Sequence, residues 1–214
     1  MAAIECRDIV FHYPRESFSL AIERLDIAAG ETVAVIGPSG CGKSTLINLI
    51  AGIQKLWSGS INIGDDQVSS MTDQQVREFR LSNIGLVPQR FELLDYLTVR
   101  ENVLLPFSLG RRSRVSAEIS DRADQLMKSV GIYHLGDRLP DNLSQGERQR
   151  TAICRGLVAR PQLILADEPT GNLDPTNQEK TVALLLEQAA VVGATVLMVT
   201  HELHFCPASS ARWI

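Results

Sequence analysis

The sequence predicts an α/β fold built around a mostly parallel sheet, and three observations carry this prediction. Short apolar runs at residues 32–36 (TVAVI), 163–166 (LILA) and 195–199 (TVLMV) are typical of strands buried on both faces. Residues 46–50 and 176–194 have helical patterns, and Gly193 is a natural stop for the second helix. Strands that alternate with helices form parallel sheets covered on both sides, so we expect this architecture.

The first thirty residues follow a different pattern. Phe18, Leu20 and Ile22 alternate at period two, and Leu25 and Ile27 continue the apolar positions. This pattern is typical of antiparallel strands that are solvated on one side. We therefore expect an N-terminal antiparallel β subdomain beside the parallel sheet.

The middle of the chain has no strong strand run. From about residue 89 to residue 160 the segments read as helical or irregular. A chain of 214 residues is long enough for one α/β domain and too short for two full-sized ones. We therefore expect residues 1–214 to form a single domain, with a helical subdomain at roughly residues 90–160 inserted in the α/β core.

Composition argues against several classes of protein. The formal net charge is −4 and the aromatic share is 5%, so no nucleic-acid partner is expected. The four cysteines have no CxxC spacing, which predicts neither a zinc site nor a disulfide framework. No apolar run approaches the roughly 20 residues that span a bilayer, and the N-terminus is charged. We expect a chain that neither crosses a membrane nor is exported through one by itself.

Residues 37–45 (GPSGCGKST) fit the pattern G-x-x-x-x-G-K-[ST] between a buried strand and a helix, as a P-loop requires. Small residues let backbone N–H groups surround an anion, and the helix adds its positive N-terminal end. Lys43 is expected to reach the β- and γ-phosphates, and the Ser44 hydroxyl to ligate Mg²⁺. The expected nucleotide-binding residues of the loop are Gly37, Pro38, Ser39, Gly40, Cys41, Gly42, Lys43, Ser44 and Thr45.

Two further strands end in polar residues that suit phosphate chemistry. The run LILADE ends in Asp167 and Glu168, and TVLMV is followed by Thr200 and His201. Ligands of open α/β sheets bind beyond the carboxyl ends of the strands, so these residues are expected to converge on the P-loop. We expect Asp167 to hold Mg²⁺ and Glu168 to act on the attacking water. The alternatives are a loop that simply begins with two acids and a structural histidine.

The run LSQGERQR predicts a helix start. Ser144 followed by Glu147 three residues later forms a capping box, and apolar residues continue on one helical face. The same helix N-terminus also suits a second anion site. Both interpretations remain open because they can hold in different nucleotide states.

Together these residues resemble the nucleotide-binding domain of ATP-binding-cassette (ABC) proteins over nearly the whole chain. GPSGCGKST matches the Walker A motif, LILADE the Walker B motif, and LSQGE the signature motif. GNLD at residues 171–174 matches the D-loop, Gln89 in VPQR the Q-loop, and His201 the switch histidine. Tyr13 in FHYP matches the aromatic residue that stacks on adenine, with an ordinary strand aromatic as the alternative.

The resemblance implies an ATPase that uses ATP and Mg²⁺ and works as a homodimer. Lys43, Gln89, Glu168 and His201 are the implied catalytic residues, and Ser44, Gln89 and Asp167 the implied Mg²⁺ ligands. Ser144 and Gly146 of one copy are expected to contact the γ-phosphate bound by the other copy, and Asp174 of the D-loop to join that site. A monomer would then be nearly idle.

Two departures from the family pattern bear on this expectation. The usual signature is LSGGQ, whereas Gln145 replaces a glycine and Glu147 the final glutamine. We expect the first change to reduce backbone freedom and the second to add negative charge near a phosphate, which would weaken the trans contacts. The stretch after His201 is short, so we expect a naturally short or a trimmed C-terminus.

The runs ADEPTGNLD and LLDYLTVRENVLLPF are similar to the branch with macrolide exporters, lipoprotein-releasing ATPases and their cell-division relative. This implies a bacterial cytoplasmic subunit, peripheral on the inner face of the cell membrane, that docks on a separate integral membrane permease. We expect the docking groove near Gln89, lined by some of Arg90, Phe91, Leu93, Leu94 and Tyr96. Ordinary core packing of these residues is the alternative.

Three functional classes remain open at this point. The first is an ATPase that drives a transporter or transmits mechanical work, and it is the one we favour. The second is a soluble ABC ATPase, such as one for iron–sulfur assembly. The third is a low-turnover module that uses ATP as a clamp to regulate a membrane protein, although Glu168 argues against a fully inactive enzyme.

Overall fold

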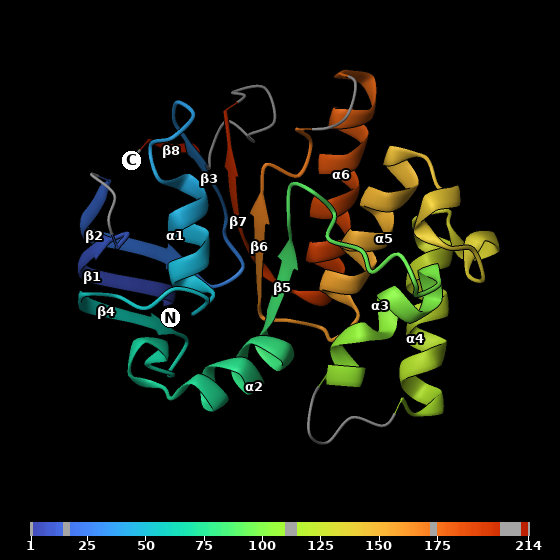
Figure 1. Ribbon diagram of the computed structural model, residues 1–214, viewed down its shortest axis with the longest axis horizontal. Coiled ribbons are helices and arrows are strands. Elements are labelled where there is room, and N and C mark those ends of the chain that lie inside the picture. The colour runs from blue at the N-terminus through green and yellow to red at the C-terminus, as the bar shows by residue number, and fades with distance from the viewer. Residues whose placement is uncertain (1, 15–17, 110–114, 172–174, 202–210, 214) are drawn as a thin grey trace.

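The computed structural model describes residues 2–14, 18–109, 115–171, 175–201 and 211–213. Its larger sheet is parallel throughout, with strand order β5-β6-β7-β3-β8 (Figure 1). The strands are β3 (Thr32–Ile36), β5 (Ile84–Val87), β6 (Leu163–Asp167), β7 (Thr195–Thr200) and β8 (Ala211–Trp213). The three strands predicted from apolar runs lie at the centre of this sheet, where both faces are covered.

A second sheet is antiparallel and has the order β2-β1-β4. It is formed by β1 (Ala2–His12), β2 (Ser19–Ala28) and β4 (Ser58–Ile63). Along β2, the side chains of Ile22, Leu25 and Ile27 are buried while Glu23 and Arg24 are exposed. The predicted one-sided burial is therefore observed along β2, and the sequence did not predict β4 of this sheet.

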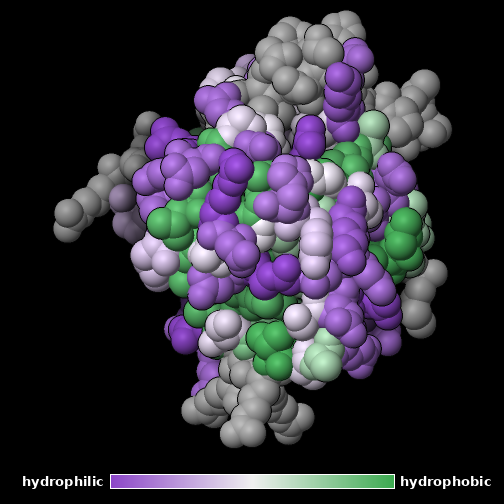
Figure 2. Space-filling view, turned by 90° about the vertical axis from the view of Figure 1, so that its right-hand side faces the viewer, coloured by the Kyte–Doolittle hydropathy of each residue, from purple (hydrophilic) through white to green (hydrophobic). Residues whose placement is uncertain are grey.

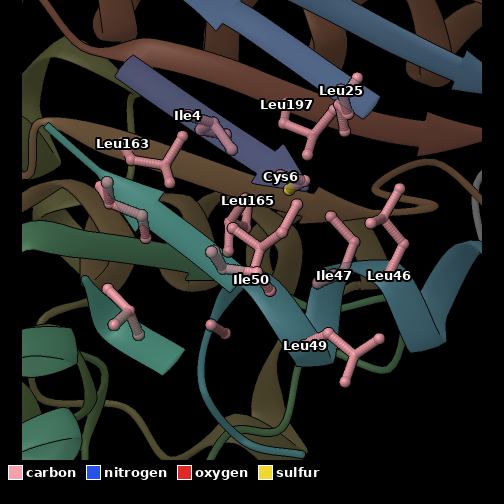
Figure 3. Packing of buried hydrophobic residues seen from close by; sticks show 14 of the residues in the cluster. Ile4, Cys6, Leu25, Leu46, Ile47, Leu49, Ile50, Leu163, Leu165 and Leu197 are labelled. Atoms are coloured by element: carbon pink, nitrogen blue, oxygen red, sulfur yellow. The ribbon is translucent and has the colours of Figure 1, made fainter. Parts of the chain in front are cut away.

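Helix α1 (Lys43–Ile50) lies between the two sheets. Its Leu46, Leu49 and Ile50 pack with Ile4 and Cys6 of β1 in one buried cluster, which also includes Leu163, Leu165 and Leu197 of the parallel sheet (Figure 3). The position of α1 is thus fixed by apolar contacts on both sides. This packing holds the P-loop, which directly precedes α1, at the carboxyl end of β3.

Helices cover the other face of the parallel sheet. Helix α6 (Pro175–Val192) and helix α5 (Gln145–Leu157) share a buried cluster with residues of β3, β6 and β7. Gly193 follows α6 with φ of 70°, a left-handed conformation that favours glycine, as expected for the stop of this helix. The two helices complete a three-layer arrangement around the central strands.

Helices α3 (Val99–Leu109) and α4 (Ala117–Ser129) lie on the side of the molecule away from the antiparallel sheet, and α2 (Asp73–Asn83) lies between that sheet and this helical side (Figure 1). Short 3₁₀ segments occur at Val68–Ser70, which contacts β4, and at Tyr133–Leu135 and Pro140–Asn142. Helices α3, α4 and α5 share a separate apolar cluster that includes Val103, Met127 and Leu135. Between β5 and β6 the described residues form helices and loops, and no strand.

Hydrophilic residues cover most of this helical side, with smaller apolar areas between them (Figure 2). Within the described part of the chain, no helix is long and apolar enough to cross a membrane.

A close backbone contact joins α5 to β5. A Cβ atom at Gly85 of β5 would lie 2.3 Å from the carbonyl oxygen of Gly156 in α5, which is closer than real Cβ contacts allow. Glycine at position 85 is therefore required for the helix to pack directly on the strand. The consequence is a fixed distance between α5 and the loop that follows β5.

Candidate functional site

A pocket of about 370 Å³ opens where β3 and β6 end at their carboxyl sides. Its lining comes from four separate parts of the chain. These residues are Tyr13, Phe18, Ser39, Gly40, Gly42, Lys43, Ser44, Thr45, Gln89 and Glu168. The pocket therefore brings together residues from distant motifs that the sequence predicts to form one site.

The P-loop has the backbone that its glycines predict. Gly40 and Gly42 have φ of 81° and 102°, both in the left-handed region. A Cβ at Gly42 would also lie 2.8 Å from the Phe18 ring. Gly42 is the N-cap of α1 and, as a glycine, has no side chain to cap the first turn. The N–H groups at this helix start are thus left for an anion.

Lys43 is folded back on the loop that precedes it. Its Nζ donates hydrogen bonds to the carbonyl oxygens of Gly37 at 2.8 Å and Pro38 at 2.9 Å. The same Nζ lies 3.8 Å from Oε1 of Glu168, and the residue is only 7% exposed. This positions a nearly buried positive charge at the pocket, which is what a phosphate ligand requires.

Ser44 of the pocket lining pairs with Asp167 at the end of β6. The Ser44 hydroxyl donates to Oδ1 of Asp167 at 2.9 Å. Burial raises the pKa of Asp167, and the neighbouring Glu168 also raises it, while the Ser44 hydrogen bond and Lys43 act in the opposite direction. A desolvated carboxylate beside a hydroxyl is a suitable partial ligand set for Mg²⁺, which usually takes only a few protein oxygens and completes its shell with phosphates and water.

These side-chain oxygens suit a metal site that is completed by phosphate and water, rather than one formed by protein ligands alone. Gln89 supplies a third side chain at the same pocket. Among the described residues, no cluster of three or more His, Cys, Asp and Glu side chains is placed to hold a metal by itself. Ser44, Asp167 and Gln89 are therefore the residues that would hold Mg²⁺ together with a bound nucleotide.

Glu168 contacts three other side chains of the site. Its Oε2 accepts a hydrogen bond from Nε2 of Gln89 at 3.0 Å, and its Oε1 lies 3.5 Å from Nδ1 of His201 and 3.8 Å from Lys43. Its backbone has φ of 42°, and its N–H donates to the carbonyl of Val199 in β7 at 2.9 Å. The carboxylate is thus held at the junction of β6 and β7, with polar groups from three other segments around it.

A family model described as "ABC transporter" matches residues 22–171, which is most of the chain. The chain belongs to the ABC transporter family. As a member of this family it is an ATP-binding subunit and an ATPase.

Named relatives agree with this assignment. The chain, called the cassette from here on, is 42% identical over 178 residues to the macrolide export ATP-binding/permease protein MacB of Rhodopirellula baltica. It is 36% identical over 176 residues to the bacitracin export ATP-binding protein BceA of Halalkalibacterium halodurans. These alignments cover 83% and 82% of the cassette, but 26% of MacB and 69% of BceA. The cassette therefore corresponds to about a quarter of MacB.

Solved structures give the same fold. The dimeric post-hydrolysis state of the ATP-binding cassette MJ0796, bound to ADP and Pi, superposes with a TM-score of 0.82 at 32% identity. That match covers 94% of the cassette and 89% of the other chain. The protein cbiO1 of Clostridium perfringens, part of the transporter complex cbiONQ, gives a TM-score of 0.85 at 29% identity, over 99% and 84% of the chains. The predicted ABC ATPase fold is confirmed.

Two aromatic residues form the wall beside α1 of the cassette. The Tyr13 hydroxyl lies 3.2 Å from Oγ1 of Thr45, and its ring packs edge-on against Phe11. The Phe18 ring lies 5.9 Å from that of Tyr13 and covers Gly42. Phe18 was expected only as a strand residue. Its period-two pattern gave no sign of the pocket, because its role depends on where β2 begins relative to α1.

Several predicted residues do not line this pocket. Asp167 and His201 lie just outside it, in contact with its lining residues Ser44 and Glu168. Gly37 and Pro38 contribute the carbonyl groups that hold Lys43, and Cys41 is exposed on the loop. Ser144 and Gly146 lie at the start of α5 and do not line the pocket of their own chain. Asp174 lies outside the described residues.

The start of α5 shows how the two departures in the signature motif are accommodated within one copy. Gln145 is the first residue of the helix and has no positive φ, so a side chain at this position does not restrict a backbone that needed glycine. The Glu147 carboxylate accepts from both N–H and Oγ of Ser144 at 2.7 Å. These hydrogen bonds lower the pKa of Glu147. The added negative charge is thus engaged in the predicted capping box.

Proposed function

We propose that two copies of this cassette close around two ATP molecules with Mg²⁺, hydrolyse them, and drive a separate membrane subunit. The observation that carries the proposal is the position of the Glu168 carboxylate, which lines the pocket and lies beside Lys43, Gln89 and His201. Six sequence motifs supply this arrangement or its partner surface, and they occur in the family order.

In the proposed mechanism the P-loop binds the phosphates first. The N–H groups of the uncapped α1 start and the Lys43 ammonium neutralise the β- and γ-phosphates. Lys43 would exchange its contacts with Gly37 and Pro38 for contacts with phosphate oxygens. Bound Mg²⁺ would supply charge neutralisation of the phosphates, and Ser44, Asp167 and Gln89 are the residues that would hold it.

Glu168 then acts on the attacking water. Its carboxylate is placed to accept a proton or to orient the water for in-line attack on the γ-phosphorus. Gln89 and His201 contact the two carboxylate oxygens and keep the Glu168 carboxylate in this orientation. Through this contact, both side chains would respond to changes at the γ-phosphate. Most of the rate enhancement in this scheme comes from positioning and charge.

The second copy completes the site. A Cβ at Gly146 would meet nothing within 4 Å, and its φ is not positive, so the folded monomer does not require glycine there. A close approach by the ATP of another copy would explain both the glycine and the exposed helix start. We therefore place Ser144 and Gly146 on the γ-phosphate in trans, with Asp174 at the same interface, as the dimeric form of the MJ0796 cassette supports.

The membrane subunit is proposed to dock at a groove of about 530 Å³ between α2, α3 and α5. The groove is mainly apolar and is lined by Arg77, Arg80, Leu81, Ile84, Leu86, Pro88, Glu92, Leu105, Pro106, Leu109, Arg155, Gly156 and Ala159. None of the five residues expected from the sequence lines it; from that segment only Glu92 does. Three arginines and one glutamate give the groove a positive balance, which favours a partner helix that is apolar on one face and acidic at its edge.

Docking on a membrane subunit would fix where the cassette works in the cell. The cassette would be a cytoplasmic protein, peripheral on the inner face of a bacterial membrane, with the helical subdomain at roughly residues 90–160 as its coupling element. The similarity to macrolide and bacitracin export proteins supports an export or release function, in which amphipathic compounds or lipoproteins are the cargo class.

Membrane association tests the proposal. The cassette produced in its own host should co-sediment with membranes, and Leu109→Glu in the groove should release it into the soluble fraction. Leu109 is 62% exposed, so the substitution leaves the fold intact. Val191→Glu on α6, at a position 76% exposed and outside the groove, is the matched control and should stay with the membrane. A wild-type cassette that is fully soluble would favour the iron–sulfur-assembly type of function.

A further inference from the structure

The loop after Gln89 contains two consecutive residues in a disfavoured conformation. Phe91 and Glu92 have φ of 59° and 49°, the left-handed region that L side chains rarely adopt. The N–H of Glu92 donates to the carbonyl of Arg90 at 2.5 Å, which closes a tight turn around Phe91. Neither position is a glycine, so the surrounding structure has to hold this turn.

Arg155 of α5 supplies that restraint. Its Nη2 donates to the carbonyl of Phe91 at 2.6 Å, and its Nη1 donates to the carbonyl of Glu92 at 2.5 Å. One guanidinium therefore bridges the two left-handed residues. Such a bridge depends on the planar, forked donors of arginine, which a lysine ammonium does not reproduce.

The other end of the loop is anchored as well. Arg155 is next to Gly156, whose carbonyl is in close contact with Gly85 of β5. The strand that leads into Gln89 and the helix that holds Phe91 and Glu92 are thus packed directly on each other. Gln89 lies between these two fixed points, with its amide on Glu168.

We propose that Arg155 is a positioning residue for ATP hydrolysis, because its bridge to Phe91 and Glu92 keeps the Gln89 amide on the Glu168 carboxylate. The inference rests on the proposed roles of Gln89 and Glu168. Arg155 and Glu92 also line the docking groove, so an occupant of the groove touches the bridge directly. The bridge would then connect a docked partner to the catalytic carboxylate through the loop that carries Gln89.

Steady-state kinetics of the purified cassette test this proposal. Arg155→Met should lower kcat for Mg·ATP by about 10-fold and change the ATP dissociation constant by less than about 2-fold, because the P-loop is untouched. Arg155→Lys should behave like Arg155→Met. Adding Phe91→Gly and Glu92→Gly to Arg155→Met should recover most of the lost kcat, because glycine adopts the turn without strain.

A matched control separates positioning from general stability. Arg122 also donates from its guanidinium to a backbone carbonyl, that of Val158 at 3.1 Å, but it lies outside the pocket and the groove. Arg122→Met should leave kcat unchanged. If Arg155→Met does not fold, the fold-change in kcat of Arg155→Lys decides between the same two results.

The inference is overturned if Arg155→Met or Arg155→Lys keeps the wild-type kcat, or if the glycine pair restores nothing. Gln89→Ala, measured in parallel, shows which idea has failed. An unchanged kcat in Gln89→Ala contradicts the proposed role of Gln89 itself. A reduced kcat in Gln89→Ala with an unaffected Arg155→Met contradicts only the role of Arg155.

Discussion

The side-chain amide of Gln89 donates a hydrogen bond to the carboxylate of Glu168, with Nε2 and Oε2 3.0 Å apart. The two residues follow neighbouring parallel strands, β5 and β6, so the sheet itself brings them together. The contact joins the proposed water-activating group to the loop that leads into the docking groove. The position of the Glu168 carboxylate is therefore central to the proposed mechanism.

Glu168→Gln should abolish most turnover while ATP still binds. The substitution keeps the shape and the contact with Gln89 but removes the carboxylate that acts on water, so kcat should fall by about 100-fold or more. Phosphate release and ATP affinity, measured on the same preparation, separate these effects. A variant with near wild-type turnover would show that another group activates the water.

Lys43→Ala should weaken ATP binding. The substitution removes a nearly buried charge aimed at the phosphates, and we expect the dissociation constant to rise by about 10- to 100-fold, or about 1.4–2.8 kcal/mol. Lys55→Ala is the control, because Lys55 is exposed and pairs with Asp73 outside the pocket. Equal ATP affinity in the two variants would contradict the assignment of the P-loop.

Asp167→Asn should raise the melting temperature of the nucleotide-free cassette at neutral pH. The folded-state pKa of Asp167 is raised, chiefly by burial, so its ionised form costs stability above that pKa. The advantage of the asparagine variant should shrink as the pH falls through the raised pKa, because the wild-type carboxyl then protonates in the folded state. Mg²⁺ with ATP should stabilise the wild type more than the variant. Thermal unfolding at several pH values measures both effects, and a difference that grows on acidification would contradict the predicted sign.

Gly85→Ala should destabilise the fold. The new methyl group meets the backbone oxygen of Gly156, which cannot move without shifting α5, and the expected cost is about 1–3 kcal/mol. Gly146→Ala is the matched control, since its methyl group meets open space in a helix, and it should be neutral or up to about 1 kcal/mol stabilising. Urea unfolding compares the two. Equal stabilities would mean that α5 does not pack on β5 through these glycines.

The sequence predicts the strands whose side chains are buried on both faces of the sheet. Strands β3, β6 and β7 are covered on both faces, so their apolar runs identify them, and Gly193 identifies the end of α6. Strand β5 has only the four residues IGLV directly after α2, with a glycine whose reason lies on α5. Strand β4 contains Ser and Gly and is specified by pairing with β1. Both depend on tertiary contacts that local patterns do not contain.

The candidate site shows the same division. Residues that follow strand ends lie next to residues of the P-loop, as in the contacts of Asp167 with Ser44 and of Glu168 with Lys43, because the topology of a parallel sheet brings them together. Their roles at a nucleotide stay a prediction. Phe18 and Arg155 were missed, and the partners of Arg155 are 63 and 64 residues away in the chain. The capped helix start predicted from Ser144 and Glu147 is observed, and Gln145 lies in its first turn without a positive φ. The expected effect of Gln145 and Glu147 on the trans contacts stays a prediction.

The solution mass of Glu168→Gln tests most directly whether two cassettes close around ATP. Light scattering after size exclusion should show a monomer without nucleotide and a doubled mass with Mg²⁺ and ATP. Gly146→Ala in the same background should remain monomeric, because its methyl group would occupy the space of the opposing γ-phosphate. If Glu168→Gln binds ATP and its mass does not double, or if Gly146→Ala doubles equally, ATP-dependent closure through the α5 start is contradicted.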